Sequence, residues 1–210
     1  MAKLTEGSIE QSFIQQLVGQ GYTYYDATDI SPVSDNPQRL NYGSVILEQH
    51  FKDSIKKLNP TLPESARSEA YQKVMNLGTE DLMENNERFH TLLTNGVTVE
   101  FTKEGRTKGI NVRLLDVENP DNNSFWAVNQ LVVKENNNEK RFDVVIYVNG
   151  LPLVFVELKS ATDEKATLRK AKGCTQHILL QLDLYRVRWY RCGNIKRVSA
   201  IFEIPFMEKT

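Results

Sequence analysis

The chain has 210 residues, of which 40% are hydrophobic, and this is enough apolar material for one sizeable core. Its 26 basic and 27 acidic residues are mixed along the sequence and leave a net charge of −1, so no basic arm or acidic tail indicates a partner. The two cysteines and the opening "MAKLTEGSIEQSF", which lacks an apolar signal region, argue against a secreted disulfide framework and favour the cytoplasm. The apolar stretches fall short of the ~20 residues that a membrane-spanning helix needs, so we expect no membrane partner.

Apolar residues recur at helical spacing through the first half of the chain, which predicts four helices. The first covers residues 8–18, with Ser8 as its cap and two glycines at its end. The second lies in "NYGSVILEQHFKDSIKKLNP", and the third follows the proline of "LPESARSEAYQKVMNL". The fourth lies in "TEDLMENNERFHTLLTNG", starting at a Thr79 cap and ending at the final "NG".

Short β-branched segments replace this pattern from residue 97 onward. They read "VTVEF", "GINVRLLDV", "FWAVNQLVV", "FDVVIYV" and "LVFVELK", with Gly, Asn, Pro and Asp between them. We expect a meander of about five strands, followed by a helix at "DEKATLRKAKG". Helices, then strands, then a further helix predict a mixed α/β (α+β) fold in which helices flank the sheet.

Two carboxylates and an ammonium stand near the ends of the apolar run "RFDVVIYVNGLPLVFVELKS". Glu157 and Lys159 are two apart in one expected strand and therefore share a face, while Asp143 lies on the preceding strand. Carboxylates that are brought together share a proton or bind a cation. Two carboxylates with water suit Mg²⁺, and a nearby ammonium can orient the attacking water and stabilise charge on a phosphate. The pattern is that of a metal-dependent phosphodiesterase, although the same residues also fit the solvated ends of two buried strands.

The strand register tests the first of these interpretations. Regular pairing through a two-residue turn at "NG" would set Asp143 opposite Val156 and turn Glu157 to the other face. An odd-length connection, or a two-residue turn with a compensating bulge, sets Asp143 across from Glu157. Pro152 cannot donate a ladder hydrogen bond and favours one of these two irregular connections. We therefore expect both carboxylates on one face.

A third carboxylate lies on the first predicted helix. Glu10 is near the centre of that helix's apolar face, which consists of Ile9, Phe13, Ile14, Leu17 and Val18. A carboxylate in such a place must be paired, protonated or bound to a metal. Glu10 is thus either a metal ligand or a carboxylate that is satisfied by backbone amides or an arginine.

Three stretches of the chain resemble one known family: "NERFHTLLTNGVTVEF", "LLDVENPDNNSFWAVNQLVV" and "RFDVVIYVNGLPLVFVELKSATDEKATLRKA". In order and spacing they are similar to the amino-terminal nuclease domain of the restriction (R) subunit of type I restriction-modification enzymes. The resemblance implies the restriction-endonuclease-like PD-(D/E)xK fold, a mixed sheet flanked by helices. It also implies a Mg²⁺-dependent endonuclease that hydrolyses phosphodiester bonds of double-stranded DNA.

The resemblance gives individual residues a role. Asp143 would be the motif aspartate, and Glu157 and Lys159 would be the E-x-K pair. Glu10 would match the carboxylate that the first helix sends into the site in related nucleases, so the metal ligands would be Asp143, Glu157 and Glu10. Phe142 stands where the family usually has proline, which we expect to be harmless because the aspartate binds the metal.

The resemblance fades toward the carboxyl-terminal part of the chain. In the family, a glutamine and a tyrosine four residues apart lie on the helix after the motif, and "QLDLY" offers Gln181 and Tyr185 as further catalytic residues, with Gln176 as a competing choice. We divide the chain into a nuclease domain with a helical amino-terminal part, residues 1–172, and a divergent segment, residues 173–210. This segment is expected to be altered or truncated relative to the family.

No "GxxxxGK[ST]" phosphate loop occurs in the sequence, so neither an ATP site nor a DNA-translocating motor is expected in this chain. By resemblance, its partners are double-stranded DNA and the methyltransferase and specificity subunits of a restriction-modification complex. Two alternatives stay open. The chain is a catalytically silent remnant that acts only as an interaction module, or it is a free-standing nuclease of the same fold.

Overall fold

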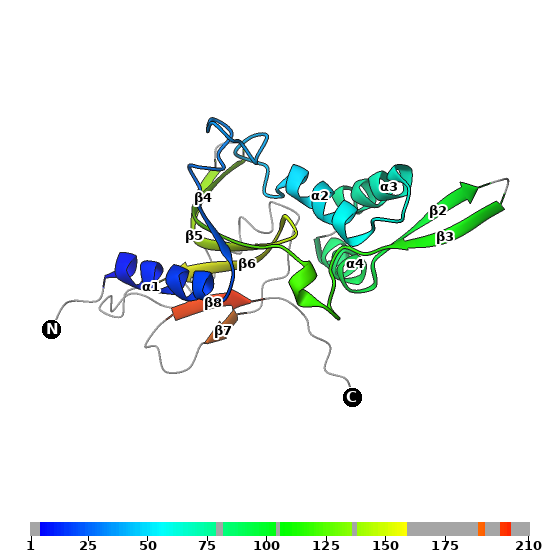
Figure 1. Cartoon of the computed structure of the whole chain (residues 1–210). Coiled ribbons are helices and arrows are strands. Elements are labelled where there is room, and N and C mark those ends of the chain that lie inside the picture. Colours follow the sequence, from blue (N-terminus) through cyan, green and yellow to red (C-terminus); the bar gives the residue numbers. More distant parts are fainter. Residues whose placement is uncertain are drawn as a thin grey trace.

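The computed structural model describes residues 5–78, 82–103, 106–135, 138–158, 189–191 and 198–202. Its main sheet, drawn in Figure 1, consists of Thr23–Asp26 (β1), Phe125–Glu135 (β4), Asn138–Val148 (β5), Leu151–Leu158 (β6), Trp189–Arg191 (β7) and Val198–Phe202 (β8). These strands lie in the order β1-β4-β5-β6-β8-β7. The sheet is mixed, because β1 runs parallel to β4 while the other neighbouring pairs are antiparallel. The mixed α/β class expected from the sequence is confirmed.

The helices of the described residues are Glu6–Gly19 (α1), Glu48–Leu58 (α2), Glu64–Met75 (α3) and Leu82–Asn95 (α4). The first starts earlier than expected, because Thr5 rather than Ser8 is its N-cap. Ser8 N donates to Thr5 Oγ1 at 3.2 Å and Thr5 N donates to Ser8 Oγ at 3.0 Å, which is a capping box. The Thr79 cap predicted for the fourth helix lies outside the described residues. None of the helices in the described ranges has the length and apolar character needed to cross a membrane.

The prediction of one continuous meander is wrong in two respects. Val97–Lys103 (β2) and Arg106–Val112 (β3) pair with each other as a separate antiparallel sheet, and this hairpin projects from the body of the molecule beyond α3 and α4 (Figure 1). The short strand β1, "TYYD", was not expected, since four residues are too few for the alternation of a strand to be visible. The helix predicted at "DEKATLRKAKG" lies outside the described residues.

The turn between β5 and β6 is built from two residues with left-handed backbones. Asn149 has a φ of 54° and Gly150 a φ of 84°, as in the primed turns that match the twist of a hairpin. Asn149 is 1% exposed, and its amide bonds three groups of the preceding segment: Ser124 N at 2.8 Å, Leu114 O at 2.9 Å and Asn123 Oδ1 at 2.8 Å. The asparagine therefore supplies both the backbone conformation of the turn and its attachment to the chain before β4.

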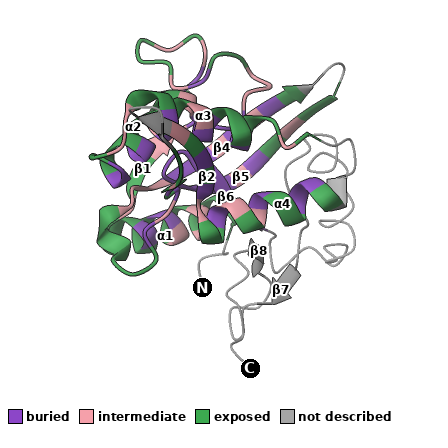
Figure 2. Cartoon of the chain, turned by 90° about the vertical axis from the view of Figure 1, so that its right-hand side faces the viewer, coloured by how far each residue is buried: buried purple, intermediate pink, exposed green. Residues whose placement is uncertain are grey.

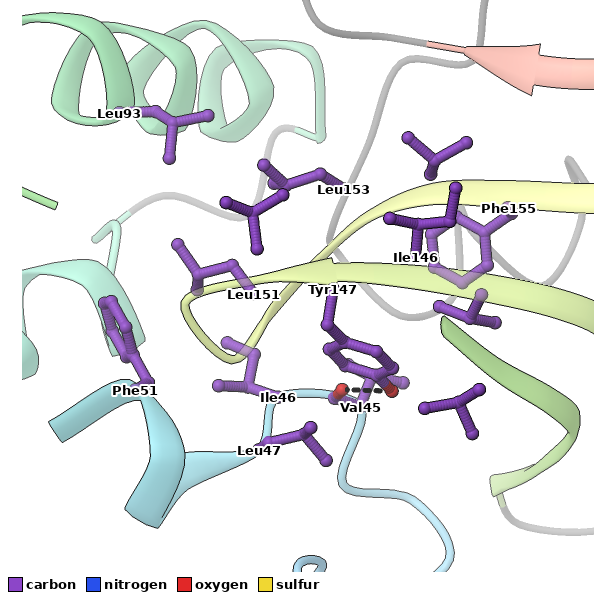
Figure 3. Packing of buried hydrophobic residues seen from close by; sticks show 14 of the residues in the cluster. Val45, Ile46, Leu47, Phe51, Leu93, Ile146, Tyr147, Leu151, Leu153 and Phe155 are labelled. Carbon is purple, nitrogen blue, oxygen red and sulfur yellow. Dashed lines mark hydrogen bonds between the residues drawn. The ribbon is translucent and has the colours of Figure 1, made fainter. Parts of the chain in front are cut away.

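The hydrophobic core surrounds this turn. Figure 3 shows apolar side chains from β5, β6, α2 and α4 converging there, and the Tyr147 hydroxyl donates to the Val45 carbonyl oxygen at 3.0 Å. Burial raises the pKa of Tyr147. Leu47 N donates to Gly150 O at 3.0 Å, so the start of α2 rests directly on the turn. Buried residues follow the central strands and the inner sides of the helices, while the outer helical surfaces are exposed (Figure 2).

Candidate active site

The pairing of β5 with β6 contains the irregularity that the nuclease interpretation requires. The turn is a two-residue one, because Val148 pairs with Leu151, but the register shifts between Ile146 and Tyr147. Leu153 is the extra residue, since Tyr147 pairs with Pro152 and Ile146 with Val154. Of the two connections predicted, an odd-length turn or a two-residue turn with a compensating bulge, the structure has the second.

On the side of the bulge away from the turn, the strand pairing places the two motif carboxylates across from each other. Val144 pairs with Val156, so the next residues along the two strands, Asp143 and Glu157, are opposite each other. Asp143 is partly buried, and its Oδ2 accepts a hydrogen bond from Leu158 N at 2.6 Å. This amide belongs to the peptide that links Glu157 to Leu158. The Asp143 carboxylate therefore lies against the β6 backbone immediately beside Glu157.

Glu157 is held in a nearly closed environment. It is 7% exposed, and Lys140 Nζ lies 3.5 Å from its Oε1. The lysine side chain is itself only 16% exposed, and its ammonium lies 5.9 Å from the centre of the Phe142 ring. A cation next to a buried carboxylate offsets part of the free energy that desolvation of the charge requires. Sequence reasoning did not identify Lys140, because nothing in "NEKRFD" distinguishes one basic residue of this strand from the next.

The regular alternation of side chains breaks where Asp143 lies. Residues 140 and 142 would share a face with Val144 in a regular strand, on the side away from Phe155 and Glu157. Lys140 nevertheless contacts Glu157, and the Phe142 ring packs on Phe155 with centroids 4.9 Å apart. Phe142, which stands in place of the usual proline, is 1% exposed and fills the core at this break.

Glu10 points from α1 to the adjacent strand β4. Its Oε1 accepts a hydrogen bond from Asn129 Nδ2 at 3.0 Å, and its Oε2 accepts one from Gln130 Nε2 at 2.7 Å. The sequence left backbone amides or an arginine as the structural explanation of this carboxylate, and its partners are instead two side-chain amides. Tyr24 Oη donates to Asn129 Oδ1 at 3.1 Å, which fixes the orientation of that amide. Burial raises the pKa of the Tyr24 phenol, and the neighbouring carboxylates of Asp26, Glu10 and Asp29 add to the effect.

The donor set for a cation consists of carboxylates. No group of three His, Cys, Asp or Glu side chains within the described ranges is gathered closely enough to hold a metal ion. The pair that the register brings together is Asp143 and Glu157, with Glu10 bonded to β4. Two carboxylates completed by water form a donor set that Mg²⁺ accepts.

Three of the predicted site residues, Lys159, Gln181 and Tyr185, lie outside the described residues. Sequence reasoning also missed Asn129 and Gln130, although a signal was present. Two adjacent amide side chains interrupt the otherwise apolar strand "FWAVNQLVV", and a buried strand rarely carries polar residues without a partner for them.

Comparison with known proteins points to one family. The family described as type I restriction enzyme R protein N terminus matches residues 3–176. The type I restriction enzyme HindI endonuclease subunit of Haemophilus influenzae is 38% identical over 169 residues, which are 80% of this chain and 16% of that protein. A Methanocaldococcus jannaschii protein, named as a candidate type I restriction enzyme MjaIXP endonuclease subunit, is 35% identical over 163 residues, 76% of this chain and 16% of that protein.

A third relative is more distant. The type I restriction enzyme EcoprrI endonuclease subunit of Escherichia coli is 28% identical over 156 residues, which are 74% of this chain and 44% of that protein. The chain thus spans 16% of the length of the first two relatives. The mixed sheet with flanking helices agrees with a restriction-endonuclease-like fold. Because the family match covers most of the 210 residues, the chain belongs to the family of the type I restriction enzyme R protein N terminus.

Proposed function

We propose that this chain is a Mg²⁺-dependent endonuclease domain that hydrolyses phosphodiester bonds of double-stranded DNA. The observation that carries the proposal is the bulge at Leu153, without which Asp143 would oppose Val156 rather than Glu157. Bulges are common near active sites, where they change the direction in which side chains point, and this one sets the register of the strand that carries Glu157. The names of the relatives, which are endonuclease subunits of type I restriction enzymes, support the same class of reaction.

The residues of the site fit a hard divalent cation. Asp143 and Glu157 would hold it, with Glu10 as the third carboxylate that the family resemblance assigns. When bound, such a cation would lower the pKa of a water molecule and offset negative charge on the phosphate. The hydrogen bond from Leu158 N holds the Asp143 carboxylate beside β6, which limits the reorganisation needed on binding.

The basic residues have separate roles in this proposal. Lys140 lies 3.5 Å from Glu157 Oε1 and holds that carboxylate in place. Lys159, the lysine of the E-x-K pair, would orient the attacking water and stabilise the charge that develops on the phosphate. Gln181 and Tyr185 stay assigned to the site by resemblance.

The charge of the chain indicates how it meets DNA. A domain that finds DNA alone usually has a basic face, whereas this chain has a net charge of −1. We therefore propose that methyltransferase and specificity subunits of a restriction-modification complex bring the DNA to this domain. Binding of DNA by the isolated chain is expected to be weak and to fall steeply with salt concentration.

The test is a nicking assay on supercoiled plasmid with Mg²⁺ or Mn²⁺, using the full chain. Asp143→Asn and Glu157→Gln remove one negative charge each and keep the side-chain volume. Glu139→Gln is the matched control, because Glu139 lies on the same strand but is 56% exposed and paired with Lys134 at 2.8 Å. Both site variants should lose more than about 100-fold of the activity, since even groups that only support a metal ligand contribute 10- to 100-fold.

The outcomes separate the proposal from its alternatives. Equal cleavage by the parent and by Glu157→Gln would show that the site assignment is wrong. A parent that does not nick DNA with either cation would favour an interaction module without catalysis. Sequence-specific, nanomolar binding by the chain alone at physiological salt would favour a free-standing nuclease.

A further inference from the structure

The ammonium of Lys140 lies within the space that a cation bound to Glu157 would take up. Its Nζ is 3.5 Å from Glu157 Oε1, and Glu157 is 7% exposed, so few directions of approach to this carboxylate are open. A cation such as Mg²⁺ binds a carboxylate oxygen at about 2.0 to 2.1 Å and keeps several waters. The ion and its first shell of water together extend to about 4 Å from that oxygen. The shell and the ammonium therefore need the same space.

The irregular part of β5 directs this lysine to Glu157. In a regular strand Lys140 would share a face with Val144 and point away from Glu157. Its ammonium instead contacts that carboxylate and lies 5.9 Å from the centre of the Phe142 ring, near the ~6 Å limit of a cation–π attraction. The lysine side chain is 16% exposed, so the contact is made largely out of water. The backbone thus sets this ion pair, which distinguishes it from a chance meeting of two surface charges.

The contact is nevertheless one that the lysine can leave. In the neighbouring ion pair of the same two strands, Lys134 Nζ lies 2.8 Å from Glu139 Oε2. The 3.5 Å between Lys140 Nζ and Glu157 Oε1 is longer than the ~2.7 to 2.9 Å of a short charge-assisted hydrogen bond. The residues on either side of Lys140, Glu139 and Arg141, are exposed, so its long stem can carry the ammonium to water.

We propose that Lys140 competes with the divalent cation for the Glu157 carboxylate and leaves it when the cation binds. The inference rests on the proposed function, because it takes Glu157 as a ligand of that cation. Two cations close to one buried carboxylate repel each other, so occupancy by one weakens binding of the other. Lys140 therefore lowers the affinity of the site for the cation, and the cation in turn releases the lysine.

A purely structural role for Lys140 has different consequences. If the ammonium only offset the desolvation of Glu157, a neutral residue in its place would lower stability and leave the affinity for a cation unchanged. If the ammonium held Glu157 in the orientation that the cation needs, a neutral residue would weaken the affinity. Competition is the role for which a neutral residue tightens binding.

The experiment is a calorimetric titration of the full 210-residue chain with Mn²⁺, with thermal unfolding recorded with and without the ion. The variants at the pair are Lys140→Met, Lys140→Gln, Lys140→Arg and Glu157→Gln. Lys140→Gln is the second neutral variant, which decides the question if Lys140→Met does not fold. Lys134→Met is the matched control, because it removes the same charge from an exposed ion pair of the same two strands.

We expect Lys140→Met to lower the Kd for Mn²⁺ about tenfold, and Lys140→Gln to change it in the same direction. Lys140→Arg, which keeps the charge, and Lys134→Met should match the parent. Glu157→Gln should raise the Kd about tenfold or more. Mn²⁺ should raise the unfolding temperature of Lys140→Met by more than that of the parent, because tighter binding to the folded chain stabilises it more.

The outcomes separate the competition from the proposed function. If both neutral variants at residue 140 bind Mn²⁺ like the parent or more weakly, while Glu157→Gln loses affinity, the competition is wrong and the proposed function stands. If Lys134→Met tightens binding as much as Lys140→Met, the effect is one of overall charge and the inference is overturned. If neither the parent nor the neutral variants bind Mn²⁺, or Glu157→Gln binds it as the parent does, the proposed metal site is wrong and the competition falls with it.

Discussion

The two ends of the β5–β6 hairpin differ in how regular their backbone and side-chain arrangement is. At the turn end, Asn149 and Gly150 adopt backbones that suit their residue types, and the Asn149 amide bonds to three groups. At the other end, the hydrogen-bonded register stops at Val144 and Val156, the alternation of side chains breaks, and the Asp143 carboxylate bonds the Leu158 amide beside Glu157. Residue types that suit their backbones thus stabilise the turn, while the break at the other end brings Lys140 to Glu157 and packs Phe142 on Phe155.

The two ends of the hairpin should therefore respond differently to substitution. Substitutions at the turn end should reduce stability, because the Asn149 amide is hydrogen-bonded and a Cβ on Gly150 would meet the start of α2. Substitutions of the carboxylates by amides should affect chemistry more than stability, since an isosteric amide removes a buried charge and with it the free energy that its desolvation requires.

Gly150→Ala should have the largest effect on stability. A Cβ at this residue would lie 2.7 Å from Phe51 N and 2.8 Å from Leu47 O, and the φ of 84° is unfavourable for alanine. We expect the free energy of unfolding, measured with urea, to fall by about 3 kcal/mol. Gly7→Ala is the matched control, because no atom lies within 4 Å of a Cβ there and Gly7 is within α1. That variant should gain about 0.5 to 1 kcal/mol, and a neutral Gly150→Ala would refute the packing argument.

Lys140→Met should have the next largest effect and lower the free energy of unfolding by about 2 kcal/mol. Glu157 is 7% exposed, so without the ammonium its charge remains desolvated with less compensation. The double variant Lys140→Met/Glu157→Gln should recover most of this loss, because it leaves no buried charge at the pair. A double-mutant cycle measured by urea unfolding gives the coupling between the two residues. Additive effects would show that Lys140 does not act on Glu157.

Glu157→Gln alone should lower the free energy of unfolding by less than Lys140→Met does. The asymmetry with Lys140→Met has a physical basis, since the lysine left behind has a long flexible stem that can carry its ammonium to water. Glutamine keeps the volume of glutamate in the core. The variant should therefore lose nicking activity while its thermal unfolding stays close to that of the parent. A loss of stability as large as that of Gly150→Ala would place Glu157 with the structural end of the hairpin.

The contrast also explains what the sequence could and could not predict. "VNGLP" contains the residues of a two-residue turn, which follows from local chemistry. Counting along it showed that the nuclease interpretation requires either an odd-length connection or a bulge, and the bulge is what the structure has. The four helices follow from their apolar spacing in the same way. The left-handed Gln130 could not be foreseen, since glutamine has no preference for that conformation and only its contact with Glu10, 120 residues away, explains it. The separate β2–β3 hairpin was missed because its residues alternate as any strand does, and only tertiary packing decides which sheet they join.

The smallest expected effect concerns His50, which lies beside the turn end. Its Nε2 is 3.0 Å from Ser124 Oγ, and its ring stacks on Trp126 with centroids 4.1 Å apart. Burial lowers the pKa of His50, Lys57 lowers it further, and Asp53 opposes the shift. The unfolded chain therefore binds a proton more readily than the folded one, so stability is complete above the unfolded pKa of about 6.5 and declines as pH falls below it.

His50→Gln should make the free energy of unfolding less dependent on pH between 7.5 and 5.5, by at most about 1.4 kcal/mol per pH unit for one proton. Glutamine keeps a polar group within reach of Ser124, which limits other changes. His90→Gln serves for comparison, because burial also lowers the pKa of His90, which lies on α4 away from the turn. Urea unfolding at several pH values measures both slopes. If His50→Gln leaves the slope unchanged while His90→Gln reduces it, the acid sensitivity arises in α4 and the turn end of the hairpin is insensitive to pH.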